Sequence, residues 1–172
     1  MYAVTVKGRF YLNKADVAPL DFPGVGRFPA FSGMKKYINQ PGCTYLRDDG
    51  AIPYGNYWIV DRPVEGYRTR FRESLSALFG QDIRRDWFAL YRADGMIDDW
   101  TFIDGIKRGN FRLHPVGPEQ ISKGCLTMLR ATDFSLLRNV LLNTSTVIVP
   151  GTNLLSYGTI EVIGYEDYCP VL

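Results

Sequence analysis

The sequence has little of the material from which metal and cofactor sites are built. It contains a single histidine and three cysteines in 172 residues. No Cys-x-x-Cys pair occurs, and one imidazole cannot supply the set of ligands that a catalytic zinc needs. We therefore expect neither a metal nor another cofactor.

The sequence also lacks an excess of charge and long apolar runs. Lys and Arg total 20 against 18 Asp and Glu, and the two signs are interspersed, so we expect no nucleic acid as a partner. No stretch approaches the roughly 20 consecutive apolar residues of a membrane span. The opening residues 1–10 lack the apolar core and cleavage site of a signal peptide. We therefore expect a chain made in the cytoplasm and not exported by the standard secretory route.

The composition fits one domain over residues 1–172. Hydrophobic residues make up 46% of the chain, which is enough for a core without help from disulfides. No repeat, linker or low-complexity tract divides the chain. In an oxidising compartment Cys43 could bridge to Cys169 and leave Cys125 free, but the spacing leaves the connectivity open.

Turn residues recur between short apolar runs, which favours a mainly β fold over a helical bundle. Expected strands cover residues 2–12, 57–60, 87–91, 96–103, 108–115, 146–149 and 159–163. Gly95 lies in the turn of a predicted hairpin between the third and fourth of these runs, and residues 19–29 are predicted as a loop. Two helices are expected: one over residues 68–79, and one that Thr132 caps and that buries Phe134, Leu137, Val140 and Leu141.

The lone histidine, His114, lies eleven residues before a cysteine that ends the turn Ser122-Lys123-Gly124-Cys125. A thiol becomes a strong nucleophile as thiolate, and a neighbouring imidazole can take its proton. Gly117 permits a chain reversal that would bring the turn back beside His114 at a strand end. Glycine before the cysteine frees the amides of Gly124 and Cys125 to face a developing oxyanion. The plainer alternative is a buried cysteine beside a buried histidine.

These segments resemble the catalytic motif of L,D-transpeptidases, and more closely that of the type VI secretion L,D-transpeptidase effector family. The resemblance covers residues 31–33, 50–57, 108–115 and 122–126 in the family's order. The sequence departs from the family patterns at three positions, which are Lys123, Ala51 and Thr127.

The resemblance implies a single L,D-transpeptidase-like β-sandwich domain with about two short flanking helices. It also implies peptidoglycan chemistry, in which Cys125 attacks the L,D bond before the terminal D-alanine of a tetrapeptide stem. His114 would act as base and then as acid. Either a backbone carbonyl or Ser122 would orient the imidazole. Transfer of the acyl group to water gives L,D-carboxypeptidase action, and transfer to a D-amino acid gives L,D-transpeptidase exchange.

The substrate carries carboxylates, which Arg112, Lys123 or Arg130 could anchor, and Tyr54 could line the groove for the stem. As an alternative, these side chains are ordinary solvated charges and surface or core aromatics. The family likeness also implies partners, namely the type VI secretion machinery and an immunity protein in the periplasm. The place of action would be the periplasm of a rival cell, where the chain would serve as a toxin in interbacterial competition.

Two other functions fit parts of the sequence. Cys43 precedes His114, which is the order found in NlpC/P60-type peptidoglycan endopeptidases. A catalytically inactive wall-binding or immunity-type protein could retain the same scaffold. The sequence does not decide the balance of hydrolysis against exchange, the delivery component or the oligomeric state.

Overall fold

A computed structural model of the chain describes residues 5–63, 86–118 and 122–170. The helix predicted over residues 68–79 lies outside these ranges. The described elements are mostly strands, so the prediction of a mainly β fold is confirmed. The strands are β1 (Val6–Tyr11), β2 (Ala18–Phe22), β3 (Gly26–Phe31), β4 (Gly55–Asp61), β5 (Phe88–Arg92), β6 (Trp100–Ile103), β7 (Ile106–Gly109), β8 (Arg112–Pro115), β9 (Leu126–Met128), β10 (Val147–Ile148) and β11 (Leu155–Ile163).

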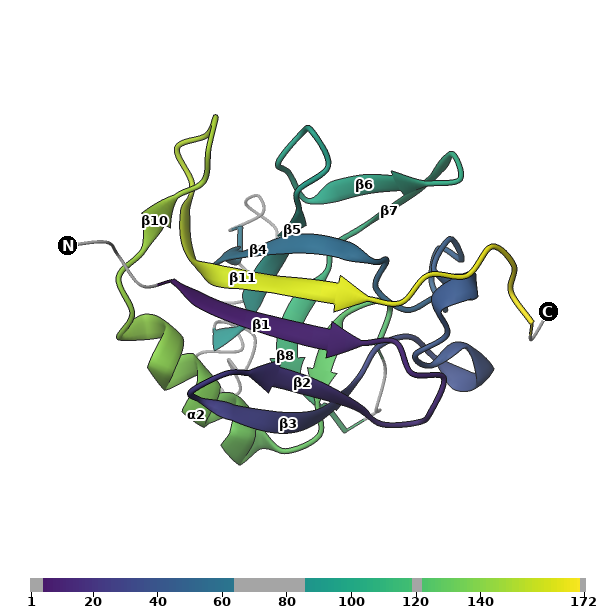
Figure 1. Cartoon of the computed structure of the whole chain (residues 1–172), viewed down its shortest axis with the longest axis horizontal. Helices are drawn as coiled ribbons and strands as arrows, with labels where there is room; N and C mark the ends of the chain where they lie inside the picture. Colours follow the sequence, from purple (N-terminus) through teal and green to yellow (C-terminus); the bar gives the residue numbers. More distant parts are fainter. Residues whose placement is uncertain (1–4, 64–85, 119–121, 171–172) are drawn as a thin grey trace.

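The main sheet closes on itself in the manner of a barrel (Figure 1). Its strand order is β1-β2-β3-β9-β8-β5-β4-β11-β10, and β1 also pairs in parallel with β11. Strands β6 and β7 form a separate two-stranded ribbon at one end of the molecule (Figure 1). Closure pairs the strands that would otherwise form exposed edges.

The core lies inside the closed sheet and beneath one helix, α2 (Ala131–Leu142). Alternation along the strands sends every second side chain inward, so that Leu20, Leu113 and Leu126 are fully buried. The helix lies at one side of the molecule and contacts β8, β9 and β11 (Figure 1). Its buried residues are Phe134, Leu137 and Leu141.

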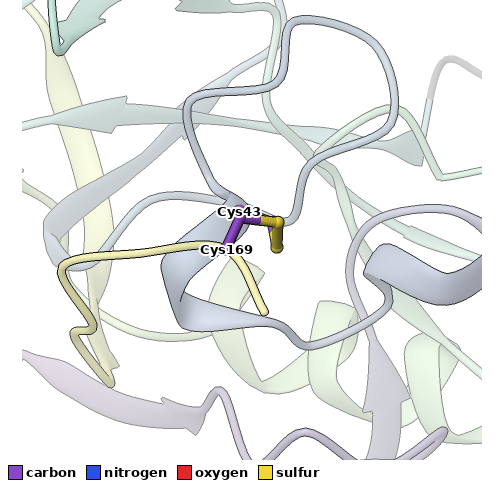
Figure 2. Close-up of a disulfide and its surroundings, with 2 residues drawn as sticks. All are labelled: Cys43 and Cys169. Carbon is purple, nitrogen blue, oxygen red and sulfur yellow. A yellow bond between two sulfur atoms is a disulfide. The ribbon is translucent and has the colours of Figure 1, made fainter. Parts of the chain in front are cut away.

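The end of the chain is joined to the segment that follows β3. Two short 3₁₀ helices occur there, η1 (Lys35–Tyr37) and η2 (Pro41–Cys43). Cys43 and Cys169 form a disulfide across 126 positions of sequence, and Cys125 is left as a free thiol. Figure 2 shows this bridge between η2 and the C-terminal segment.

The loop predicted over residues 19–29 is wrong, because β2 and β3 form a hairpin there. Leu20, Phe22 and Phe28 are buried along it, while the prolines that suggested a loop, Pro19 and Pro29, face each other in the register. The two missing N–H groups therefore fall at one rung of the ladder, and the remaining rungs can form.

The hairpin predicted around Gly95 is also wrong. Strand β5 pairs with β4 and β8, whereas β6 turns through Asp104 and Gly105 to pair with β7. Both turn residues have positive φ, 50° and 75°, as a tight hairpin connection requires. Gly95 does have a positive φ, but the segment around it connects β5 to β6, which do not pair with each other.

Two further boundaries differ from the predictions. The strand expected over residues 108–115 is interrupted at Asn110, where φ is 56°, and so becomes β7 and β8. Helix α2 begins after Arg130, so Thr132 lies inside its first turn and is not the cap. The strands expected near residues 57–60, 146–149 and 159–163 are present as β4, β10 and the second half of β11.

Candidate active site

The lone histidine lies on β8, one of the central strands of the main sheet. The imidazole of His114 is 4% exposed, and the indole of Trp87 stacks on it with ring centroids 4.1 Å apart and planes inclined by 18°. Nδ1 lies 2.7 Å from the carbonyl oxygen of Pro115. Because a carbonyl only accepts hydrogen bonds, Nδ1 carries the proton in the neutral ring and the lone pair lies on Nε2. The orienting group at Nδ1 is thus a backbone carbonyl.

The strand next to β8 is β9, and Cys125 directly precedes it. The two strands run parallel with Leu113 opposite Leu126 and His114 opposite Thr127. The hydroxyl of Thr127 lies 3.5 Å from Nε2 of His114. Alternation, extended one residue before β9, places Cys125 on the same face of the sheet as His114 and Thr127. The sequence predicts that the turn that ends at Cys125 lies alongside His114, and the parallel pairing of β8 with β9 does bring the two segments together.

The thiol of Cys125 is held between two polar backbone groups. The S–H donates toward the carbonyl of Asn110 at 3.8 Å, and the backbone N–H of Arg112 is directed at the sulfur. Burial raises the pKa of the Cys125 thiol, while the Arg112 N–H and the positive charges of Arg112 and Arg108 act in the opposite direction. The net shift of the Cys125 pKa is upward.

The turn before Cys125 depends on Gly124 and Ser122. Gly124 has a φ of 83°, in the left-handed region that favours glycine. The Ser122 hydroxyl donates to the carbonyl of Cys125 at 2.7 Å and so braces the turn. Ser122 was our side-chain choice for orienting the imidazole, but this hydrogen bond directs its hydroxyl to the backbone beside the thiol.

Arg112 does not present an open cation to a substrate. Its guanidinium forms two hydrogen bonds with the carboxylate of Asp99, at 2.6 and 2.7 Å, and a third with the carbonyl of Phe111 at 2.9 Å. Both side chains of the ion pair are largely buried, at 9% and 12% exposure. A bidentate pair of this kind fixes the direction of the guanidinium beside Cys125.

A cavity of about 680 Å³ opens beside the thiol. It is lined by Arg47, Asp48, Arg62, Pro63, Trp87, Trp100, Lys107, Arg108, Gly109, Asn110, Arg112, Lys123 and Cys125. The lining contains six basic side chains and one acidic side chain, so the cavity suits an anionic ligand. Trp87 lines the cavity and also stacks on the buried imidazole of His114.

The remaining predicted residues divide between the cavity and other surfaces. Lys123 is exposed and lines the cavity. Tyr54 is not among the lining residues; its ring packs edge-on against Tyr165 at 5.1 Å and lies beneath Arg92. Arg130 lies 3.9 Å from Asp133 at the start of α2.

Sequence reasoning missed Asp99, Trp87 and Arg108 as parts of this site. Asp99 and Trp87 belong to no motif, and each reaches the thiol or the imidazole only through strand pairing between distant segments. Arg108 lies within the segment that carries the family resemblance. The sequence does not reveal that this arginine is buried, because an arginine is usually a surface charge.

The described residues bear on the alternative nucleophile, on metal ligands and on membrane spans. Cys43, the alternative nucleophile, is fully buried and oxidised in the disulfide with Cys169. In the described part of the chain, no group of three or more His, Cys, Asp or Glu side chains is arranged to hold a metal ion. The helices that the structure describes are all too short or too polar to cross a membrane.

Comparison with known proteins places the chain in a family. No curated protein matches the chain. The model of the Tlde1 domain matches residues 26–152, a span that holds the cavity, the free thiol and the lone imidazole. The chain therefore belongs to the Tlde1 domain family, the type VI secretion L,D-transpeptidase effectors that modify peptidoglycan.

Proposed function

We propose that the protein is a cysteine-dependent L,D-carboxypeptidase or L,D-transpeptidase that acts on the tetrapeptide stems of peptidoglycan. The observation that carries this proposal is the parallel pairing of β8 with β9, which puts the free thiol of Cys125 and the imidazole of His114 on one face of the sheet. The base lies on β8 and the nucleophile directly precedes the neighbouring strand β9, so the pairing of these two strands brings the two groups together.

The proton path starts from the tautomer of His114. The Pro115 carbonyl holds the proton on Nδ1, so Nε2 accepts the proton of the Cys125 thiol. The sulfur then forms a bond to the carbonyl carbon of the L,D bond. The electron pair of the breaking C–N bond goes to the nitrogen of D-alanine, which takes the proton back from Nε2 and leaves.

The second half of the reaction returns the enzyme to its starting state. Water, or the amine of a D-amino acid, gives a proton to Nε2 and attacks the thioester carbon. The C–S bond breaks, and the thiolate of Cys125 recovers the proton from His114. A left-handed residue such as Gly124 (φ 83°) allows successive backbone N–H groups to face a common point, and we assign the oxyanion site to the N–H groups of Gly124 and Cys125.

The basic lining of the cavity supports the choice of substrate. A tetrapeptide stem ends in the carboxylate of D-alanine and carries a further carboxylate on its third residue when that residue is diaminopimelate. Lys123 and Lys107 are exposed in the lining, whereas Arg112 is already engaged by Asp99. We assign the carboxylate-binding role to the exposed lysines.

The proposal also covers where the protein acts. Delivery by the type VI machinery would carry it to the periplasm of a target cell, and a periplasmic immunity protein that covers the basic cavity would protect the producer. An oxidising compartment is consistent with the Cys43–Cys169 disulfide.

Digestion of purified sacculi tests the proposed reaction. Mass analysis of the released muropeptides should show tripeptides, or stems with an exchanged terminal D-amino acid, after incubation with the protein. Cys125→Ser and His114→Gln should each abolish both products. Cys43→Ser with Cys169→Ser should retain them, although with a lower yield.

Other product patterns would contradict the proposal. Cleavage inside the stem that requires Cys43 would assign the protein to the NlpC/P60 type. Unchanged muropeptides, with the protein bound to sacculi, would indicate a wall-binding protein without catalysis.

A further inference from the structure

Arg108 is among the most deeply buried large side chains of the protein, and the reaction above gives it no role. It projects from β7 with 2% exposure. One terminal nitrogen donates to the carbonyls of Thr44 and Ala51, the latter at 3.3 Å, and the other donates to the carbonyl of Gly50 at 3.0 Å. Burying a guanidinium costs free energy unless hydrogen bonds compensate for the lost water. A buried arginine with three carbonyl acceptors therefore indicates a structural role for the side chain.

The three carbonyls belong to one compact segment, residues 43–51, which we call the carbonyl loop. Consecutive turns build it: the Leu46 N–H donates to the Cys43 carbonyl at 3.2 Å, and the Gly50 N–H donates to the Leu46 carbonyl at 3.1 Å. Its first residue, Cys43, is bound covalently to Cys169 (Figure 2). The disulfide therefore anchors the loop that holds Arg108.

The opposite side of the guanidinium lies against the turn of the nucleophile. A Cβ atom placed on Gly124 would overlap a terminal nitrogen of Arg108, and the next closest atoms belong to the ring of Phe111. The guanidinium carbon lies 5.4 Å from the centroid of that ring. Arg108 thus occupies the space directly behind the Gly124–Cys125 backbone.

The charge of Arg108 reaches the thiol as well. Its three hydrogen-bond acceptors in the carbonyl loop are backbone carbonyls, which carry no formal charge, while Tyr57, Asp48 of the same loop and Cys125 interact with it electrostatically. Burial lowers the pKa of Arg108 to about 10, which keeps it cationic at neutral pH. This cation lowers the pKa of the Cys125 thiol, against the larger upward effect of burial.

We propose that Arg108 is a positioning residue for the nucleophile: the carbonyl loop, locked by the Cys43–Cys169 disulfide, presses its guanidinium against Gly124 and so holds the Cys125 thiol and its turn in the reactive arrangement. The inference deepens the proposed function, since it takes Cys125 as the nucleophile. Reduction of a disulfide outside the cavity would therefore alter the thiol inside it.

Alkylation of Cys125 tests the proposal without any peptidoglycan substrate. The rate of reaction with iodoacetamide is followed by mass spectrometry from roughly pH 5 to pH 11, a range that brackets the ordinary thiol pKa of about 8.5. In Arg108→Met the midpoint should move to higher pH, because the cation is lost. In Arg108→Lys the charge remains but the planar fork is lost, so the midpoint should move less.

The same variants are then assayed on a soluble disaccharide tetrapeptide. Because a misplaced reacting group costs rate more than binding, kcat should fall by about 100-fold in Arg108→Lys while KM stays near the wild-type value. Arg27→Met is the matched control, since Arg27 is an exposed arginine of β3 outside the cavity lining. It should leave both the midpoint and kcat unchanged.

A variant without the disulfide, Cys43→Ser with Cys169→Ser, tests the lock and leaves Cys125 as the single thiol. Its alkylation midpoint should also rise and its kcat should fall. If Arg108→Met fails to fold, Arg108→Lys and this double variant decide the outcome. Wild-type midpoints and kcat in folded Arg108 variants overturn the proposal. An Arg108-dependent midpoint in a protein that leaves muropeptides unchanged would contradict the proposed function and support the positioning role.

Discussion

At position 124 the backbone conformation and the space behind it both exclude a side chain. The φ of 83° costs a residue with a Cβ about 1 kcal/mol or more, and the methyl group of alanine would also overlap Arg108. We expect Gly124→Ala to lower the free energy of unfolding by at least about 1 kcal/mol and kcat by about 100-fold. Urea denaturation and turnover of the soluble tetrapeptide measure the two effects.

Gly117 provides the control for this substitution. It lies in the connection between β8 and β9, and a Cβ built there meets no atom within 4 Å. Gly117→Ala should leave turnover unchanged and alter stability by less than about 1 kcal/mol. Equal losses in the two variants would show that Gly124 has no special role.

The ion pair of Asp99 and Arg112 beside the thiol allows a test of the direction in which each charge shifts the pKa of Cys125. Asp99 raises the pKa of the Cys125 thiol and Arg112 lowers it. Asp99→Asn should therefore shift the midpoint of Cys125 alkylation to lower pH, and Arg112→Gln should shift it to higher pH. Each substitution also breaks a largely buried pair and should cost about 3 kcal/mol of stability. Shifts in the same direction would exclude an electrostatic origin.

Among the elements, helix α2 allows the effect of capping on the free energy of unfolding to be measured separately from the effect of packing. The helix begins after Arg130 and forms no side-chain hydrogen bond at its cap, whereas Leu137 is fully buried. We expect Thr132→Ala to change the free energy of unfolding by less than about 0.5 kcal/mol and Leu137→Ala to cost about 2–5 kcal/mol. Thermal and urea denaturation of the two variants would check this. A large loss in Thr132→Ala would restore Thr132 as the cap.

The elements also show what alternation in the sequence can and cannot reveal. Residues 57–60 read as a strand because their apolar and β-branched side chains face both covered sides of β4. In residues 19–29 Leu20 and Phe22 alternate and are buried, but the prolines and glycines of the segment are typical of a loop and obscure this pattern. Alternation does not reveal which strands pair: β5 and β6 are consecutive in the chain, but β5 pairs with β4 and β6 pairs with β7. That choice depends on non-local packing, which no window of sequence contains.

For the molecule as a whole, the candidate site also combines residues that the local sequence predicts with residues that only the fold brings together. Two local signals identified His114 and the turn before Cys125, and the pairing of β8 with β9 made them neighbours. Asp99 lies directly before β6, and Arg108 lies on β7. Their charges act on the thiol because the fold pairs Asp99 with Arg112 and places Arg108 beside Gly124. The local sequence pattern predicts the two candidate reactive groups, whereas the charged residues around them could be found only from the three-dimensional fold.

The disulfide joins the two halves of the chain, so its contribution belongs to the whole molecule. It closes a loop of 126 positions between Cys43 and Cys169, and cross-links over such distances remove much of the freedom of the unfolded chain. We expect Cys43→Ser with Cys169→Ser to lower the free energy of unfolding by about 2–5 kcal/mol, and the melting temperature by roughly 6–12 °C for a loss of about 3 kcal/mol. Calorimetry of the oxidised protein, the reduced protein and this variant measures the effect. Equal melting temperatures for all three would mean that the C-terminal segment contributes no constraint, and the carbonyl loop would then need another anchor.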